Sequence, residues 1–273
     1  MSLIEAIVLG AVQGITEFLP ISSTGHLILV PWLLGWEPQG LAFDVALHVG
    51  TLLALLVYFR NDWIAFAKAG IGMALPGKAP PNAKDRQLVL YIVAATIPGG
   101  VAGLLFEDLV ETMLRGPLVV AATLILVAGA MAWAERNGRR IKDVTRITWA
   151  DALVVGVAQA LAIVPGVSRS GITITAGLAR GMERATAARF SFLLSAPIIG
   201  GAASKKVLDL VSEGLSADAA LMLGAGIVSA AIVGYLAIAF MLRYLATHTT
   251  YLFVGYRVIL GIVVLLAFWF GFR

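Results

Sequence analysis

Six long apolar runs dominate this chain and limit what it can fold into. They lie at about residues 43–59, 88–106, 117–134, 190–204, 219–242 and 251–271. Each approaches the roughly 20 residues that an α-helix needs to cross a bilayer. Charged residues make up only 13% of the 273 residues, whereas soluble domains carry about 25%. The sequence therefore predicts an all-α polytopic membrane protein with six transmembrane helices.

Two pairs of shorter apolar stretches precede the two sets of three runs. The first pair covers about residues 3–18 and 26–36, and the second covers about 150–164 and 172–180. A polar segment that contains proline and glycine interrupts each pair. Irregular backbone at membrane depth must be buried in protein or line a wet cavity. We therefore expect two re-entrant helix-loop-helix hairpins in addition to the six spans.

The two halves of the chain resemble each other in sequence. Identical residues recur at a separation of 146 positions: Gly10 and Gly156, Gln13 and Gln159, Ser22 and Ser168, and Gly25 and Gly171. These matches fall on the two polar segments. We therefore expect a single membrane domain made of two repeat halves, at about residues 1–146 and 147–273. Three spans in each half is an odd number, so the halves would be inverted relative to each other.

Basic residues predict the orientation in the membrane. Segments 60–87 and 135–148 hold five Lys and Arg residues each, and six spans would put both segments on one side. Such an excess marks the cytoplasmic face. Both termini would then lie outside, and the hairpins would enter from opposite sides and meet near the midplane. This arrangement is expected to bring His26 and Arg169 into one pocket.

The first polar segment, QGITEFLPISSTGH, begins at Gln13. Gln13 and Glu17 are four residues apart, so they share one face of the first short helix, which Pro20 ends. Three hydroxyl residues begin the next helix: Ser22, Ser23 and Thr24. The free backbone amides of a helix N-terminus suit a phosphate group.

The same segment contains the side chains of a phosphoryl-transfer site. Ser23 is a candidate nucleophile, His26 a general acid or base, and Glu17 an acidic orienter or metal ligand. For Ser22, helix capping is the more common role, and a single His between helices is often a packing residue. A carboxylate near the bilayer centre is harder to explain without function, since it costs roughly 2.5 kcal/mol or more.

The second polar segment, PGVSRSG at residues 165–171, repeats this design around an arginine. Arg169 stands between Ser168 and Ser170, and Thr173 follows one turn later. The helix dipole favours anions at a helix N-terminus, so a cation is poorly placed there unless it faces a bound anion. The planar guanidinium can hold phosphate oxygens in a bidentate grip. The alternative is an arginine that reaches toward lipid headgroups.

Together the motifs E/Q-x-x-x-E, P-x-S-S-T-x-H and P-G-x-S-R-S-x-x-T resemble the signature of the bacterial undecaprenyl pyrophosphate phosphatases of the bacitracin-resistance type. The likeness covers essentially the whole chain, with Gln13 at the first acidic position. The resemblance implies hydrolysis of undecaprenyl pyrophosphate to undecaprenyl phosphate, the lipid carrier for peptidoglycan. It also implies a location in the bacterial cytoplasmic (inner) membrane, with a pocket open to the outer face.

The resemblance further implies site residues and partners. Catalytic roles are expected for Glu17, Ser23, His26 and Arg169. Phosphate binding is expected for Ser22, Thr24, Gly25, Ser168, Ser170 and Thr173. A divalent cation, Mg²⁺ or Ca²⁺, is implied, with Glu17 and Gln13 as the expected ligands. We favour Ser23 as nucleophile with His26 as its base, and a phosphohistidine at His26 is the alternative.

A second function stays open at this point. Inverted repeats, interrupted helices and a midplane arginine are also features of transporters, so an anionic-lipid flippase or a small-anion transporter is the competing hypothesis. The Ser-Ser-Thr-x-His cluster argues against it, because anion transport has little use for a hydroxyl beside an imidazole and a carboxylate. For the enzyme we expect membrane lipid as the surroundings, bacitracin as a competitor for the substrate, and no nucleic acid. A homodimer is left open.

Other residues carry weaker signals. Asp44 and His48 could form a metal or headgroup site, but packing at the membrane interface is the preferred interpretation. Gly99 and Gly103 are typical of helix packing. Arg257, inside the last apolar run, needs an anionic or carbonyl partner that the sequence does not identify.

Overall fold

The computed structural model describes residues 1–37, 40–74, 82–213 and 216–271, and these residues form helices and no β-strand. This confirms the predicted all-α class. The helices are α1 (Leu3–Phe18), α2 (Ser23–Leu34), α3 (Gly40–Tyr58), α4 (Arg60–Ala74), α5 (Ala83–Met113), α6 (Pro117–Asn137), α7 (Trp149–Ala160), α8 (Arg169–Ala179), α9 (Arg184–Glu213), α10 (Ala217–Thr247) and α11 (Tyr251–Trp269), with 3₁₀ turns at Val144–Arg146 and Leu161–Ile163.

Within the described ranges, five helices are long and apolar enough to cross a membrane: α5, α6, α9, α10 and α11. The pair α3 and α4 makes a sixth span if the two are taken together across a bend of 81°. The six predicted apolar runs thus correspond to α3, α5, α6, α9, α10 and α11, which confirms the polytopic membrane class.

The bend between α3 and α4 departs from the sequence prediction. Segment 60–87 was expected to connect two spans, but its first part is helix α4, and residues 75–81 lie outside the described ranges. Neither proline nor glycine stands at the break. Instead, the indole Nε1 of Trp63 donates a hydrogen bond to the Leu55 carbonyl at 3.3 Å, and its ring packs edge-on against Phe66. Of these two contacts, the hydrogen bond to Leu55 links α4 to α3 across the bend.

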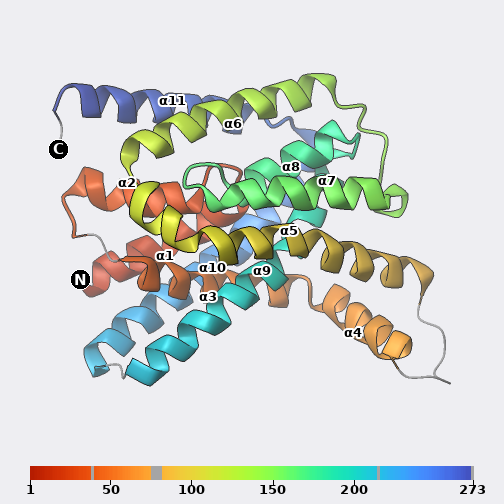
Figure 1. Ribbon diagram of the computed structural model, residues 1–273, viewed down its shortest axis with the longest axis horizontal. Coiled ribbons are helices and arrows are strands. Elements are labelled where there is room, and N and C mark those ends of the chain that lie inside the picture. Colours follow the sequence, from red (N-terminus) through yellow and green to blue (C-terminus); the bar gives the residue numbers. More distant parts are fainter. Residues whose placement is uncertain (38–39, 75–81, 214–215, 272–273) are drawn as a thin grey trace.

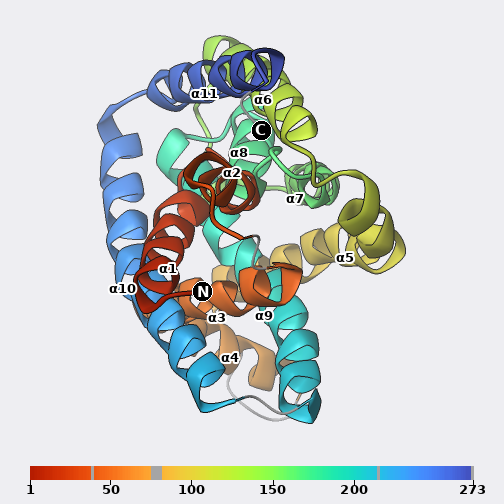
Figure 2. The ribbon, with the colours of Figure 1, turned by 90° about the vertical axis from the view of Figure 1, so that its left-hand side faces the viewer.

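Two helix-turn-helix units, α1–α2 and α7–α8, occupy the middle of the molecule (Figure 1). Helices α6 and α11 cover them on one side, and α3, α9 and α10 lie on the other (Figure 2). Both termini lie at one end of the molecule, and the connection from α6 to α7 lies at the opposite end (Figure 1). The two polar segments that the sequence singled out form the turns of these units.

The first helix of each unit packs closely on a long helix. A Cβ atom at Gly10 would lie 2.3 Å from the carbonyl oxygen of Gly226 on α10, and one at Gly156 would lie 2.6 Å from that of Ala95 on α5. Real Cβ atoms essentially never approach other atoms so closely. Glycine at both positions therefore allows backbone contact between the helices.

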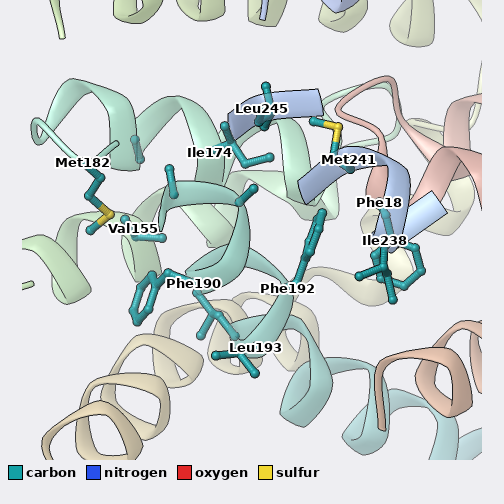
Figure 3. Close-up of a cluster of buried hydrophobic side chains, with 14 of the residues drawn as sticks. Phe18, Val155, Ile174, Met182, Phe190, Phe192, Leu193, Ile238, Met241 and Leu245 are labelled. Atoms are coloured by element: carbon teal, nitrogen blue, oxygen red, sulfur yellow. The ribbon is translucent and has the colours of Figure 1, made fainter. Parts of the chain in front are cut away.

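A core of apolar side chains joins the two units to the spans around them (Figure 3). Phe18 of α1 meets Phe192 of α9 edge-to-face, with ring centroids 5.4 Å apart. Ile174 of α8 and Met241 of α10 are completely buried in the same cluster. The residue before the turn is thus packed in a core to which α8, α9 and α10 all contribute.

Two buried carboxylates tie helices together at the end of the molecule that carries the basic segments. Glu135, in the last turn of α6, accepts hydrogen bonds from Arg184 at the start of α9. Asp151, in the first turn of α7, accepts hydrogen bonds from Lys142 at 2.8 and 2.9 Å and from Arg180 at 2.8 Å. Both carboxylates are almost fully buried, so removing a partner would leave a buried charge uncompensated.

Arg257 supplies the contact that fixes the two turns relative to each other. It is fully buried in α11, and its guanidinium donates hydrogen bonds only to backbone carbonyls among the contacts observed. The acceptors are Pro20 (3.0 Å), Gly166 (2.8 Å), Val167 (3.0 Å), Leu124 (3.2 Å) and Thr123 (3.4 Å). These carbonyls come from the turns of both units and from α6. The expected partner of Arg257 is therefore a set of backbone carbonyls.

We predict that Arg257→Lys destabilises the protein strongly although the charge is kept. Lysine carries three donors and no planar fork, so at least two of the five carbonyls would lose their partner. Because hydrogen bonds to charged groups contribute about 1.5–3 kcal/mol each, the loss should be about 3 kcal/mol or more. Thermal unfolding in detergent measures it. Arg243→Lys, at an exposed position of α10, is the matched control, and equal unfolding of the two variants would contradict the prediction.

Candidate active site

The two turns have the same unusual backbone. Ser22 and Ser168 are the N-caps of α2 and α8, and their φ angles are 78° and 71°. The Ser22 hydroxyl accepts a hydrogen bond from Gly25 N at 3.2 Å, and the Ser168 hydroxyl accepts one from Gly171 N at 3.0 Å. Left-handed backbone is uncommon for serine and often occurs at functional sites. Capping, the alternative interpretation of Ser22, is thus one role of its hydroxyl.

Glu17 is the centre of a cluster that joins four helices. Ser23 Oγ donates to Glu17 Oε2 at 2.5 Å, and Gln13 Nε2 donates to the same oxygen at 3.0 Å. Arg169 Nη2 forms an ion pair with Glu17 Oε1. His48 Nε2 lies 3.4 Å from Glu17 Oε2. The carboxylate is only 6% exposed, so the low dielectric around it strengthens each of these interactions.

The cluster faces a cavity of about 230 Å³. Around Glu17, the polar lining comes from Ser22, Ser23, Thr24, His48, Ser168 and Arg169. The structure therefore brings the hydroxyl, carboxylate and guanidinium of both polar segments to one cavity. Hydroxyl and guanidinium donors around such a cavity are suited to the oxygens of a phosphate group.

His26 lies elsewhere, and the expectation that it shares a pocket with Arg169 is wrong. Its Nδ1 lies 2.7 Å from the Ser22 carbonyl oxygen, which can only accept, so Nδ1 carries the proton. Its Nε2 then accepts from the Tyr256 hydroxyl of α11 at 2.6 Å, and the two rings stack. His26 does not line the cavity, because the hydrogen bond with Tyr256 holds its imidazole against α11.

Three further residues expected to bind phosphate lie behind the cavity wall. Ser170 Oγ donates to the Leu19 carbonyl at 3.1 Å. Thr173 Oγ1 lies 2.6 Å from Ser191 Oγ. A Cβ at Gly25 would lie 3.1 Å from a Val120 methyl group, which makes Gly25 a close-packing position. None of the three lines the cavity, so a role in phosphate binding stays a prediction for them.

His48 is a site residue that sequence reasoning considered but assigned to packing at the membrane interface. Its Nδ1 lies 2.7 Å from the Asp44 carbonyl oxygen, which holds the ring so that Nε2 points to Glu17. The Asp44 carboxylate accepts a hydrogen bond from Arg115 at 2.6 Å. Interfacial packing is therefore the wrong interpretation of His48. The available signal was the spacing of Asp44 and His48, which puts both on one face of a helix inside an apolar run.

Gly103 also differs from its predicted role. Gly99 packs against α7, since a Cβ there would lie 3.1 Å from Gln159 Nε2, but a Cβ at Gly103 would meet no atom within 4 Å. Both glycines line the cavity. Helix packing is thus correct for Gly99 and wrong for Gly103, which borders open space.

Glu17 and Gln13 are the residues of the cluster that could hold a divalent cation. In the described part of the chain, no three His, Cys, Asp or Glu residues are grouped for a metal ion. Gln13 Oε1, however, is buried beside Glu17 and has no hydrogen-bond partner among the described residues. Mg²⁺ commonly binds one or two protein oxygens and completes its shell with water and substrate phosphates. Glu17 and Gln13 fit that kind of site.

Comparison with known proteins gives the family. The model of the family "Bacitracin resistance protein BacA" matches residues 6–263. The chain belongs to this family. A relative from Moorella thermoacetica is 49% identical over 269 residues, which cover 98% of this chain and 99% of the relative. A relative from Gemmatimonas aurantiaca is 50% identical over 265 residues, 97% of each protein. Both relatives are named undecaprenyl-diphosphatase.

Proposed function

We infer that this BacA-family protein is an undecaprenyl-diphosphatase, which hydrolyses undecaprenyl pyrophosphate to undecaprenyl phosphate and inorganic phosphate. The observation that carries this function is the contact of Glu17 with both Ser23 and Arg169 at one cavity. Ser23 as nucleophile, Glu17 as proton acceptor and the guanidinium of Arg169 as phosphate-binding group are thereby in contact. The full-length similarity to named undecaprenyl-diphosphatases supports the same substrate.

The contacts suggest how the reaction starts. Ser23 Oγ attacks the terminal phosphorus, and its proton passes to the Glu17 carboxylate, to which it is already hydrogen-bonded. The bond between that phosphorus and the bridging oxygen breaks, and undecaprenyl phosphate leaves with the electron pair. Water then attacks the phosphorus of the phosphoserine, and Ser23 Oγ leaves with the electron pair of the broken bond and takes back the proton from Glu17. Inorganic phosphate is released, and the Ser23 hydroxyl and the Glu17 carboxylate are restored. Glu17 thus takes the role of base that sequence reasoning gave to His26.

Arg169 links substrate binding to the basicity of Glu17. Without substrate its guanidinium pairs with Glu17 and donates to the Ser195 carbonyl at 3.1 Å. A diphosphate offers more negative oxygens, so the guanidinium would turn part of its donors to the phosphate. Glu17 then loses some of the positive charge beside it and becomes a better proton acceptor. A divalent cation held by Glu17, Gln13 and the phosphates would neutralise charge on the diphosphate. Its charge would also weaken Glu17 as a proton acceptor, and the shift of Arg169 toward the phosphate offsets that effect.

We further propose that the protein consists of inverted halves in the bacterial inner membrane, with the cavity accessible from the outer side. Equivalent residues support the repeat. Ser22 and Ser168 are both left-handed N-caps, and Gln13 and Gln159 both bury an amide oxygen that lacks a partner among the described residues. Both termini lie at the end of the molecule opposite the α6–α7 connection (Figure 1), as this topology requires. Bacitracin would compete for the lipid pyrophosphate.

The function is tested by phosphate release from undecaprenyl pyrophosphate with the purified protein in detergent. We expect release by the wild type and its loss on addition of EDTA. An anion transporter or flippase would move its ligand in vesicles without releasing phosphate. Absence of phosphate release with and without added Mg²⁺ or Ca²⁺ would therefore reject the proposed function.

Ser23→Ala should still bind the lipid pyrophosphate but lose turnover by roughly a thousandfold or more, as in other enzymes that lose a nucleophile. Radiolabelled substrate should leave phosphate on Ser23 of the wild type. Ser204→Ala, which removes an exposed hydroxyl of α9, is the control. An acid-labile, base-stable phosphate on His26 in Ser23→Ala would assign the attack to His26 instead.

Arg169→Lys should fold normally and lose activity. Lysine keeps the charge but cannot bind two phosphate oxygens in a planar fork. Loss of charge-assisted hydrogen bonds worth about 2–3 kcal/mol corresponds to a decrease of about 30- to 150-fold in kcat/KM. Steady-state phosphate release measures it, and a matching melting temperature shows that the fold is intact. Near-full activity would mean that Arg169 acts only as a diffuse positive charge.

The topology is tested by cysteine labelling, because the chain has no native cysteine. A membrane-impermeant maleimide added to whole cells with a permeabilised outer membrane should label Asp218→Cys, in the first turn of α10. It should label Arg139→Cys, after α6, only when the inner membrane is opened. Both positions are exposed in the structure. The reverse pattern would refute the proposed orientation.

A further inference from the structure

The cavity at Glu17 has two chemically different ends. Its polar end carries the hydroxyl groups and Arg169, as described above. The rest of its lining is mostly apolar and comes from Val45, Gly99, Gly103, Ile198 and Ala202 of helices α3, α5 and α9, with the amide of Gln159 from α7 beside Gly99. A ligand that fills the whole cavity must therefore combine a strongly polar group with an apolar part.

The apolar end opens onto the outer surface of the helix bundle. Ala202 of α9 is exposed although it lines the cavity. Gly103 of α5 faces open space, and the next two residues, Leu104 and Leu105, are 79% and 70% exposed. In a protein with this many apolar spans, exposed leucines of a spanning helix face lipid. The mouth between Gly103 and Ala202 thus borders the hydrocarbon of the bilayer.

The helices that carry these two residues, α5 and α9, also diverge along their length. Helices α5 and α9 contact each other near the middle of the molecule and diverge toward the end where the N-terminus lies (Figure 1). Small residues on both sides, Gly103 and Ala202, leave the gap unfilled by side chains. A larger residue at either position would narrow it.

We propose that the isoprenoid tail of the lipid diphosphate leaves the cavity between α5 and α9, past Gly103 and Ala202, and enters the bilayer there. The inference rests on the proposed function and adds the binding site of the tail. It explains why a glycine that makes no packing contact stands at position 103. The diphosphate stays at the polar end, and the tail passes from the apolar wall directly to lipid without contact with water.

The experiment uses the absence of native cysteine. The Gly103→Cys variant is treated with benzyl methanethiosulfonate, which adds a bulky apolar group that dithiothreitol removes. We expect the adduct to lower kcat/KM for undecaprenyl diphosphate by at least about tenfold, because binding energy of the remote tail is lost. Hydrolysis of farnesyl diphosphate, whose tail is much shorter, should fall less than about threefold, because less of its binding energy comes from the tail. Dithiothreitol should restore both activities.

Gly129→Cys is the matched control. Gly129 is an exposed glycine of the spanning helix α6, a Cβ there would meet no atom within 4 Å, and the residue does not line the cavity. Its adduct should leave both activities unchanged. Full activity of Gly103→Cys after complete labelling, measured by mass spectrometry, would overturn the tail route, and so would an equal loss with both lipids. If the unmodified protein hydrolyses neither lipid, the proposed function fails instead.

Discussion

The buried guanidinium of Arg257 is the interaction on which the site depends. Two turns from opposite halves of the chain present carbonyl oxygens that have no helical partner, and carbonyls in a low-dielectric interior need a donor. One side chain with five donors meets them at Pro20, Gly166 and Val167 and also holds α6. The positions of Ser23 and Arg169 relative to each other follow from this shared anchor, because each lies within three residues of a carbonyl that Arg257 holds.

Much of the fold follows from the sequence because lipid restricts the choice of structure. A long apolar run can only be a helix in a bilayer, even where it contains proline and glycine, as α5 does at Pro98 and Gly99. Helices α5, α6 and α11 accordingly lie where their runs predict. The turns at Ser22 and Ser168 were equally visible, since Pro20 and Pro165 interrupt the apolar pattern. The bend after Tyr58 was not visible, because it depends on the fit of the Trp63 indole against Leu55 and not on a helix-breaking residue.

The site shows the limit of sequence reasoning more clearly. Residue type and spacing identified Glu17, Ser23 and Arg169, which the structure brings into contact. The same information could not decide between two histidines. His26 is four residues from Ser22 and bonds with Tyr256, 230 positions away, whereas His48 reaches Glu17 from a different helix. Which histidine reaches Glu17 depends on how helices that are distant in sequence are rotated about their axes. The local sequence pattern carries no information about that rotation.

The ion pairs at the end of the molecule that carries the basic segments have a consequence for how the protein is made. In the proposed orientation, Lys142, Arg180 and Arg184 lie on the cytoplasmic side and belong to the excess of positive residues that orients a membrane protein during insertion. In the folded protein the same three residues bind the buried carboxylates of Glu135 and Asp151. The same three positive charges therefore contribute both to orientation during insertion and to the stability of the folded protein. A neutral substitution at any of these positions would affect biogenesis twice, first in the translocon and then in the assembled bundle, so orientation and stability cannot evolve independently here.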